Sequence, residues 1–148
     1  MMSKSEFNNG RIVGLAISKE RGTKKGSIEF VRLVENSGIE GDAHRDSYRE
    51  VSLLSIEERD KIALKKLKPG EAAENILIEG IKNLSEIKKG EKILLGESAI
   101  LEVLQVGKET HDSPIHRFTG RPVLPTVGVF CRVLKGGTVR IGDKVRVV

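Results

Sequence analysis

Short apolar runs, many alternating with polar positions, recur along the chain, and a two-residue period is typical of β-strands with one buried face. In residues 11–18, for example, Val13, Leu15 and Ile17 fall on one side of an extended segment. Eight stretches predict strands: residues 11–18, 27–35, 51–54, 75–79, 91–95, 98–106, 138–141 and 144–148. Short strands separated by turn residues predict a mostly antiparallel, barrel-like sheet.

One stretch has a helical pattern instead. Ser55 and Glu58 have the spacing of a helix N-terminal capping box, in which the serine hydroxyl accepts from a backbone N–H three residues later. Apolar positions between residues 56 and 67 can share one helix face, and Pro69 with Gly70 is expected to end the helix.

Two segments near the C-terminus are less regular. We interpret residues 127–134 as a short helix ended by Gly136 and Gly137, with a strand as the alternative. Residues 107–126 are expected to form a long polar loop, and such loops are commonly functional or mobile. The predicted fold is mostly β with one or two short helices. We expect a flexible N-terminus over residues 1–9 and a single domain over residues 10–148.

The composition fits a folded, soluble protein. Of 148 residues, 38% are hydrophobic and 32% are charged, which excludes a disordered chain. Aromatic residues make up 3% and tryptophan is absent, which argues against an RNA-stacking surface. The net charge of +5 favours anionic partners such as phosphorylated cofactors, nucleotides or non-specifically bound nucleic acid. A merely solvated basic surface is the alternative.

A single cysteine, Cys131, excludes an internal disulfide and a cysteine-rich zinc site. Its neighbours are apolar, so a buried structural thiol is favoured over a nucleophile. No apolar run is long enough for a signal peptide or a membrane span. We therefore expect a cytoplasmic protein without membrane contact.

The loop following the second predicted strand carries candidate chemistry. Asp42 and His44 alternate, so they share one side of an extended segment, and Gly41 permits a turn that aims them inward. A carboxylate can orient an imidazole for acid–base catalysis, which makes both residues candidate catalytic residues. The alternative is a polar surface turn with solvated charges.

Other polar residues occur at element junctions. Asn75 begins a predicted strand, where its amide can bind a ligand or its own backbone. His111 and His116 lie five residues apart, which matches no standard zinc spacing, so no metal site is predicted. Arg132 lies in an apolar stretch and requires an anionic partner, either a ligand or an internal carboxylate.

Five motifs in order resemble one family. They are Gly-Ile-Glu-Gly-Asp-Ala-His (38–44), Arg-Glu-Val-Ser-Leu-Leu (49–54), Pro-Gly-Glu-Ala-Ala-Glu-Asn-Ile (69–76), Gly-Lys-Glu-Thr-His (107–111) and Gly-Val-Phe-Cys-Arg-Val-Leu-Lys-Gly-Gly (128–137). Together they are similar to the MOSC domain, found at the C-terminus of molybdenum cofactor sulfurases and as small stand-alone bacterial proteins. The resemblance runs over residues 10–148.

The resemblance implies a barrel-like fold that binds molybdenum cofactor (molybdopterin), a phosphorylated pterin dithiolene. It also implies a part in moving or using the sulfur of the cofactor, with a pyridoxal-phosphate-dependent cysteine desulfurase as a possible partner. No pyridoxal-phosphate lysine site is recognised in this chain. The residues implied to bind the cofactor are Arg49, Ser52, Asn75, Lys108, His111 and Arg132.

The sequence departs from the family at its sulfur chemistry. Thr110 stands where related stand-alone members carry cysteine. A second cysteine that the family often has a few residues later is absent, and Ser113 and Pro114 stand there. Cys131 falls where the family tends to have alanine. A hydroxyl cannot hold a persulfide, so cofactor binding is favoured over cysteine-based catalysis.

Three functions remain open from the sequence. The first is a carrier or chaperone of molybdenum cofactor or a related phosphorylated pterin. The second is a molybdenum-dependent reductase or sulfurtransferase that uses Asp42 and His44, with Cys131 as a substitute thiol. The third is a basic barrel that binds nucleotides or nucleic acid through its positive field, although nucleic acid is the less favoured partner.

Overall fold

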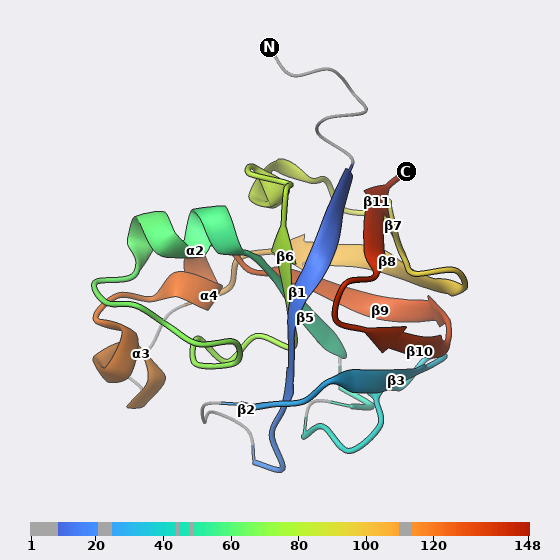
Figure 1. The fold of residues 1–148 in the computed structure, drawn as a ribbon, viewed down its shortest axis with the longest axis horizontal. Coiled ribbons are helices and arrows are strands. Elements are labelled where there is room, and N and C mark those ends of the chain that lie inside the picture. Colours follow the sequence, from blue (N-terminus) through green and yellow to red (C-terminus); the bar gives the residue numbers. More distant parts are fainter. Residues whose placement is uncertain (1–8, 21–24, 44, 48, 110–113) are drawn as a thin grey trace.

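A closed β-barrel forms the body of the protein (Figure 1). The computed structural model describes residues 9–20, 25–43, 45–47, 49–109 and 114–148. The barrel strands are β1 (Asn9–Ile17), β5 (Val51–Ser55), β6 (Ile76–Glu79), β7 (Lys92–Leu95), β8 (Ala99–Val106), β9 (Val129–Lys135) and β11 (Lys144–Val147). Their order is β11-β7-β8-β9-β5-β6-β1, and pairing of β1 with β11 closes the ring. Among these described strands only β5 and β6 run parallel. The prediction of a mostly β, barrel-like fold is confirmed.

The barrel interior is filled by alternate residues of its strands. In β9, for example, Val129, Cys131 and Val133 are completely buried and join one continuous core cluster. Successive side chains on a strand point to opposite faces, so Phe130 and Arg132 lie on the outer face of the barrel. Residues 127–134 were predicted as a helix, and this prediction is wrong for the part from Val129 onward. The segment forms a strand because this conformation buries every second side chain in the barrel interior.

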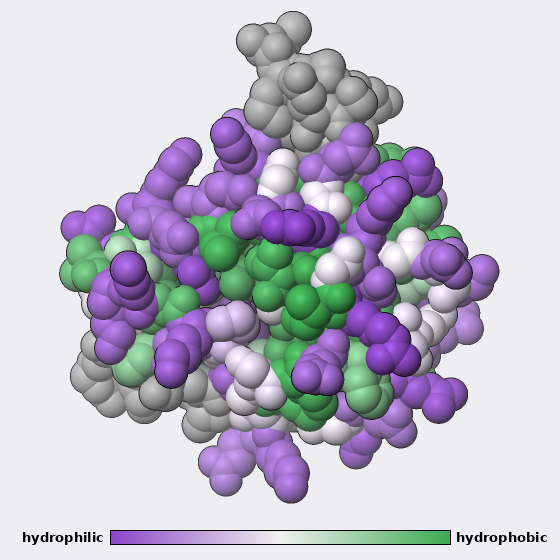
Figure 2. All heavy atoms as spheres, viewed as in Figure 1, coloured by the Kyte–Doolittle hydropathy of each residue, from purple (hydrophilic) through white to green (hydrophobic). Residues whose placement is uncertain are grey.

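A second, three-stranded sheet packs beside the barrel. It consists of β10 (Gly137–Arg140), β3 (Phe30–Val34) and β4 (Gly38–Ile39). The two-residue strand β2 (Gly26–Ser27) belongs to the larger sheet instead, where it pairs antiparallel with β1. The inner side chains of the three-stranded sheet, including Leu33 and Val139, join the core cluster of the barrel. Its outer face leaves Phe30 49% exposed. In the view of Figure 1, Figure 2 shows apolar surface near the centre of the molecule, framed by hydrophilic side chains.

Helices gather on the opposite side of the barrel from this sheet (Figure 1). They are α2 (Ile56–Ile62), α3 (Pro114–Thr119) and α4 (Val123–Val127). A short 3₁₀ turn, η1 (Leu84–Glu86), contacts α2, because the backbone N–H of Ser85 donates to Oε1 of Glu58 at 2.9 Å. The part of residues 107–126 predicted as an irregular loop therefore contains α3 and the start of α4. No helix in the described ranges is long and apolar enough to cross a membrane.

The helix predicted after Ser55 begins as expected and ends early. The Ser55 hydroxyl accepts a hydrogen bond from the backbone N–H of Glu58 at 3.2 Å. The last helical residue is Ile62, and the prediction that the helix continues to Pro69 is wrong. Beyond it, the backbone N–H of Leu64 donates to the carbonyl oxygen of Thr119 at 3.2 Å, so a tertiary contact with α3 replaces further helical hydrogen bonds.

The predicted flexible N-terminus lies almost entirely outside the described residues, which begin at Asn9. Asn9 itself is already part of β1 and pairs with Arg146 in β11. Strand β1 therefore includes the last residue of the segment predicted to be flexible.

Candidate functional site

A small recess opens on the outer face of the barrel, where strands β5 and β9 meet helices α3 and α4. We call it the Phe130 pocket. Its volume is about 50 Å³, and the residues that line it are Arg49, Ser52, Ala73, Lys108, Ile115, Leu124 and Phe130. These residues come from six separate parts of the sequence. Three of them, Arg49, Ser52 and Lys108, belong to the predicted cofactor-binding set.

Phe130 and Ser52 form the strand-borne part of the pocket. The two residues are direct cross-strand partners in the antiparallel pair β5–β9, so their side chains share one face. Val51 and Leu53 flank Ser52 in sequence and are completely buried in the barrel core. This alternation directs the Ser52 side chain outward, beside the aromatic ring.

Two cations lie near the Phe130 ring. Cζ of Arg49 lies 5.7 Å from the ring centroid, and Nζ of Lys108 lies 5.4 Å from it. These distances allow cation–π attraction, which holds both charges at the pocket. Neither cation forms an ion pair with a carboxylate of the described residues. Their charge therefore remains available to an anionic ligand.

Backbone hydrogen bonds fix the segment that carries Lys108. The N–H of Gly107 donates to the Gly128 carbonyl oxygen at 2.8 Å, and the N–H of Lys108 donates to the Pro125 carbonyl oxygen at 2.9 Å. Gly107 has a φ of 72°, and a side chain there would meet the Pro125 carbonyl oxygen at 2.8 Å. Glycine is thus required for the turn that presents Lys108.

The pKa of the Lys108 ammonium group is lowered. Partial burial is the main cause, because it disfavours the charged form, and repulsion by Arg49 and Lys25 adds to it. A lysine crowded by other cations is stabilised when an anion binds next to it. The electrostatics of the pocket therefore favour occupation by a negative group.

Arg49 is held indirectly by its neighbour Glu50. The Glu50 carboxylate is buried, and Oε1 accepts a hydrogen bond from the backbone N–H of Val133 at 3.0 Å. This contact attaches the entrance of β5 to β9. Arg49 itself is exposed, so its guanidinium is accessible to a ligand from solvent.

Asn75 lies behind Ser52 and connects three strands. Its Oδ1 accepts from the backbone N–H of Ser52 at 3.0 Å and from the Ser52 hydroxyl at 3.1 Å. Its Nδ2 donates to the Ala16 carbonyl oxygen of β1 at 3.1 Å. Asn75 is 1% exposed and does not line the pocket. It orients Ser52, while its predicted direct contact with a cofactor has no support from this geometry.

Arg132 lies on the same outer face of β9 but outside the Phe130 pocket. Its Nε donates to Oε1 of Glu102, on the neighbouring strand β8, at 2.7 Å. The anionic partner expected from the sequence is therefore an internal carboxylate. Of the remaining predicted residues, His111 and Thr110 lie outside the described residues.

Of the two predicted catalytic residues, Asp42 and His44, the structure describes only Asp42. Asp42 is buried, and its Oδ1 accepts hydrogen bonds from Nζ of Lys25 at 2.8 Å and from the backbone N–H of Ser18 at 3.0 Å. Asp42 does not line the Phe130 pocket. His44 lies outside the described residues, so the proposed orientation of its imidazole by Asp42 stays a prediction.

Cys131 faces the barrel interior and is completely buried. Burial raises the pKa of its thiol, and the nearby charge of Glu102 adds to this effect. A thiol that is neutral and inaccessible is a poor nucleophile and a poor metal ligand. The geometry supports the structural interpretation of Cys131.

Sequence reasoning missed the apolar half of the pocket, formed by Ala73, Ile115, Leu124 and Phe130. For Phe130 a signal was present: in a strand, Phe130 and Arg132 face opposite to Cys131. Because the sequence analysis interprets this segment as a helix, the alternation of a strand was not applied to Phe130. Ala73 has a φ of 69°, an uncommon conformation for alanine that no sequence pattern predicts.

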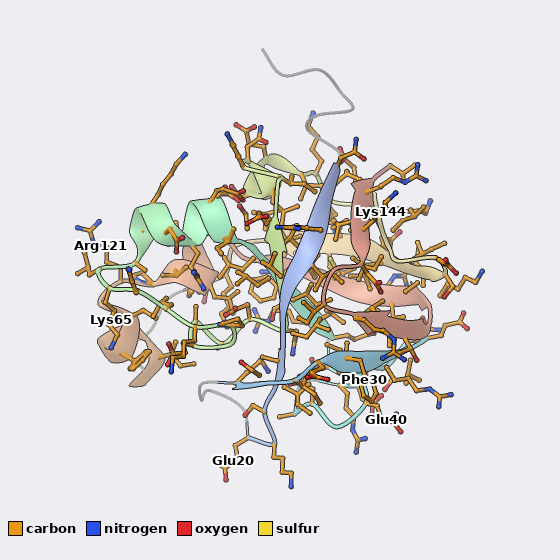
Figure 3. All side chains as sticks on the ribbon, in the orientation of Figure 1. Glu20, Phe30, Glu40, Lys65, Arg121 and Lys144 are labelled. Atoms are coloured by element: carbon orange, nitrogen blue, oxygen red, sulfur yellow. The ribbon has the colours of Figure 1, made fainter. Side chains whose placement is uncertain are left out.

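Two wider hollows contain none of the predicted site residues. One is lined by residues of α2 and the following loop, including Arg59 and Lys65, and the other includes Arg11 and Lys144. Nζ of Lys65 lies 3.6 Å from the ring centroid of Phe118 in α3. Figure 3 shows Glu20 and Arg121 projecting from the periphery of the molecule, as expected for solvated charges.

Comparison with solved structures identifies the fold. The chain is similar to the YuaD protein from Bacillus subtilis, with a TM-score of 0.78 and 23% identity over 94% of this chain and 95% of that one. It is also similar to YiiM from Geobacillus stearothermophilus, with a TM-score of 0.64 and 19% identity over 94% and 75% of the two chains. YiiM from Escherichia coli gives a TM-score of 0.61 and 18% identity over 93% and 69%. The chain has the YuaD and YiiM fold. No protein-family model and no curated protein matches it.

Proposed function

We propose that this chain is a MOSC-type protein that binds molybdenum cofactor, or a related phosphorylated pterin, through the Phe130 pocket. The observation that carries the proposal is the placement of Arg49 and Lys108 beside one aromatic ring, with no carboxylate partner among the described residues. Both cations belong to the motifs that resemble the MOSC domain. The fold shared with YuaD and YiiM is consistent with that resemblance.

The pocket suits one end of such a ligand. The recess is small, at about 50 Å³, which suits a compact group such as a phosphate. Arg49 and Lys108 would hold the phosphate, and the apolar surface of Ile115 and Leu124 would exclude water from it. When bound, the group supplies molybdenum and dithiolene sulfur for redox or sulfur chemistry.

A carrier role is favoured over a sulfurtransferase that uses Cys131. The described residues contain one cysteine, and it is buried in the barrel interior. A persulfide on Cys131 would have to form where neither a desulfurase nor an acceptor can reach it. Binding and protection of the cofactor require only Arg49, Lys108 and the apolar lining.

The proposal is tested by purifying the protein from a molybdate-fed, cofactor-competent cell and measuring bound pterin and molybdenum. Wild type should retain both in about equal amounts. The double variant Arg49→Ala/Lys108→Ala should lose them, because two charge-assisted contacts to phosphate are removed. Arg11→Ala/Lys144→Ala removes the same two kinds of charge away from the pocket and should behave like wild type. Equal loading of the two double variants would reject the Phe130 pocket as the site.

A further inference from the structure

Ser52 lines the Phe130 pocket, and its hydroxyl group donates a hydrogen bond to Oδ1 of Asn75. The direction of this hydrogen bond is fixed by the amide of Asn75. Nδ2 of Asn75 donates to the Ala16 carbonyl oxygen at 3.1 Å, and Oδ1 accepts from the Ser52 N–H at 3.0 Å. Exchanging the two ends of the amide would place donor against donor and acceptor against acceptor. The amide orientation is therefore determined by its partners.

It follows that Ser52 is the donor in its side-chain contact with Asn75. Oδ1 carries no hydrogen, so the 3.1 Å contact between Oδ1 and the Ser52 Oγ uses the hydroxyl proton. The backbone N–H of Asn75 also donates to the same Oγ at 3.1 Å. The hydroxyl has one donor site and two acceptor sites, and one of each is occupied. What it can offer a ligand is a single acceptor lone pair.

We infer that the Phe130 pocket selects oxyanions that carry a proton over oxyanions that carry none. Arg49 and Lys108 attract any anion, whereas the Ser52 oxygen, while its proton is donated to Asn75, accepts a hydrogen bond from a group that donates. An unprotonated oxygen placed against Ser52 brings two acceptors together without a hydrogen between them. The inference rests on the proposed function, because it assigns the same pocket to an anion. It names the ligand class as a phosphate, or a phosphate monoester held in its protonated form.

Hydrogen phosphate and sulfate provide the matched pair of probes. At slightly alkaline pH both are mainly tetrahedral dianions of similar size, and only hydrogen phosphate has an O–H. The pocket should bind inorganic phosphate at least about tenfold more tightly than sulfate, which is the factor expected for one unmade hydrogen bond. Affinities are measured by two-dimensional ¹H–¹⁵N NMR titration at constant ionic strength, following the backbone amides of Ser52 and Lys108.

Three variants isolate the hydroxyl. Ser52→Ala removes the acceptor but retains the backbone hydrogen bonds between residues 52 and 75, including Asn75 N–H to the Ser52 carbonyl oxygen at 3.0 Å. It should reduce the phosphate-to-sulfate ratio to about one. Ser52→Thr keeps a hydroxyl and should keep the preference. Ser27→Ala is the control, because the Ser27 hydroxyl donates to the Pro69 carbonyl oxygen on another part of the surface.

The outcomes separate this inference from the proposed function. A phosphate preference that disappears in Ser52→Ala and persists in Ser52→Thr supports the inference. Equal affinities for phosphate and sulfate, both weakened by Arg49→Ala, would overturn the selection by Ser52 and leave the anion pocket in place. If Arg49→Ala weakens the binding of neither phosphate nor sulfate, both the selection by Ser52 and the proposed anion pocket would be overturned.

Discussion

Nζ of Lys25 lies 2.8 Å from Oδ1 of Asp42, and both side chains are almost completely buried. The pair joins the segment before β2 to the loop after β4. It also places the Asp42 carboxylate under the loop, where the backbone N–H of Ser18 is a further donor. An ion pair in this position is a structural clamp for the loop that the sequence marks as a catalytic candidate.

Breaking this clamp should be costly. Asp42→Asn removes the charged carboxylate from a buried ion pair with Lys25, and we expect a loss of about 3–5 kcal/mol in the free energy of unfolding. Urea denaturation measures the change. Asp46→Asn is the control, because Asp46 is exposed in the same loop and asparagine tolerates its positive φ. Similar stability of the two variants would contradict a structural role for Asp42.

As pH rises, anion binding at the Phe130 pocket should begin to weaken at a lower pH than it would if the pocket held an exposed lysine. The pKa of Lys108 is lowered by burial and by the charges of Arg49 and Lys25. As pH rises, Lys108 therefore loses its proton before an exposed lysine does, and the pocket loses one of its two positive charges. Phosphate affinity measured from pH 7 to pH 10 should fall across this range. In Lys108→Arg the fall should vanish, since arginine stays charged.

The barrel was predictable because local sequence patterns, namely apolar runs and turn residues, indicate its strands. Ser55 likewise marked the start of α2 by its cap. The end of α2 was not predictable, because a contact between Leu64 and Thr119, far apart in sequence, decides it. For the site, Arg49, Ser52 and Lys108 came from motif resemblance. Phe130 was missed because the packing of the closed barrel, rather than local propensity, makes its segment a strand.

Glu74 should make stability depend on pH. Burial raises the pKa of its carboxyl group, while a hydrogen bond from the Gly70 N–H and the charge of Arg59 oppose the rise. Between the ordinary pKa of 4.5 and the raised value, the folded chain binds more protons than the unfolded chain, so stability falls as pH rises. Glu74→Gln cannot ionise and lacks this loss.

The advantage of Glu74→Gln over wild type should therefore grow with pH through that window, by about 1.4 kcal/mol for each unit of the pKa rise. Chemical denaturation at a series of pH values from 4 to 8 measures it. Glu97→Gln, at an exposed position, should show no such trend. A stability difference for Glu74→Gln that stays constant with pH would contradict the assignment.

Cys131 should be unreactive in the folded protein. Its side chain is completely buried and the pKa of its thiol is raised, so reaction requires opening of the barrel. Alkylation by iodoacetamide at pH 8 should be at least about a hundredfold slower in the native protein than in urea. Rapid native labelling, or a persulfide on Cys131 after incubation with a desulfurase and cysteine, would restore the sulfurtransferase hypothesis.

We propose that Arg49 and Lys108 of the Phe130 pocket, which form no ion pair with a carboxylate of the described residues, bind the phosphate of a pterin. The most direct measurement is the dissociation constant of a phosphorylated pterin, determined by fluorescence titration, for wild type, Arg49→Ala and Arg132→Ala. Arg132 is the matched control, because it lies outside the pocket and pairs with Glu102. We predict binding weakened about tenfold or more by Arg49→Ala and unchanged by Arg132→Ala. Equal affinity of Arg49→Ala and wild type, or an equal loss in both variants, would contradict the claim.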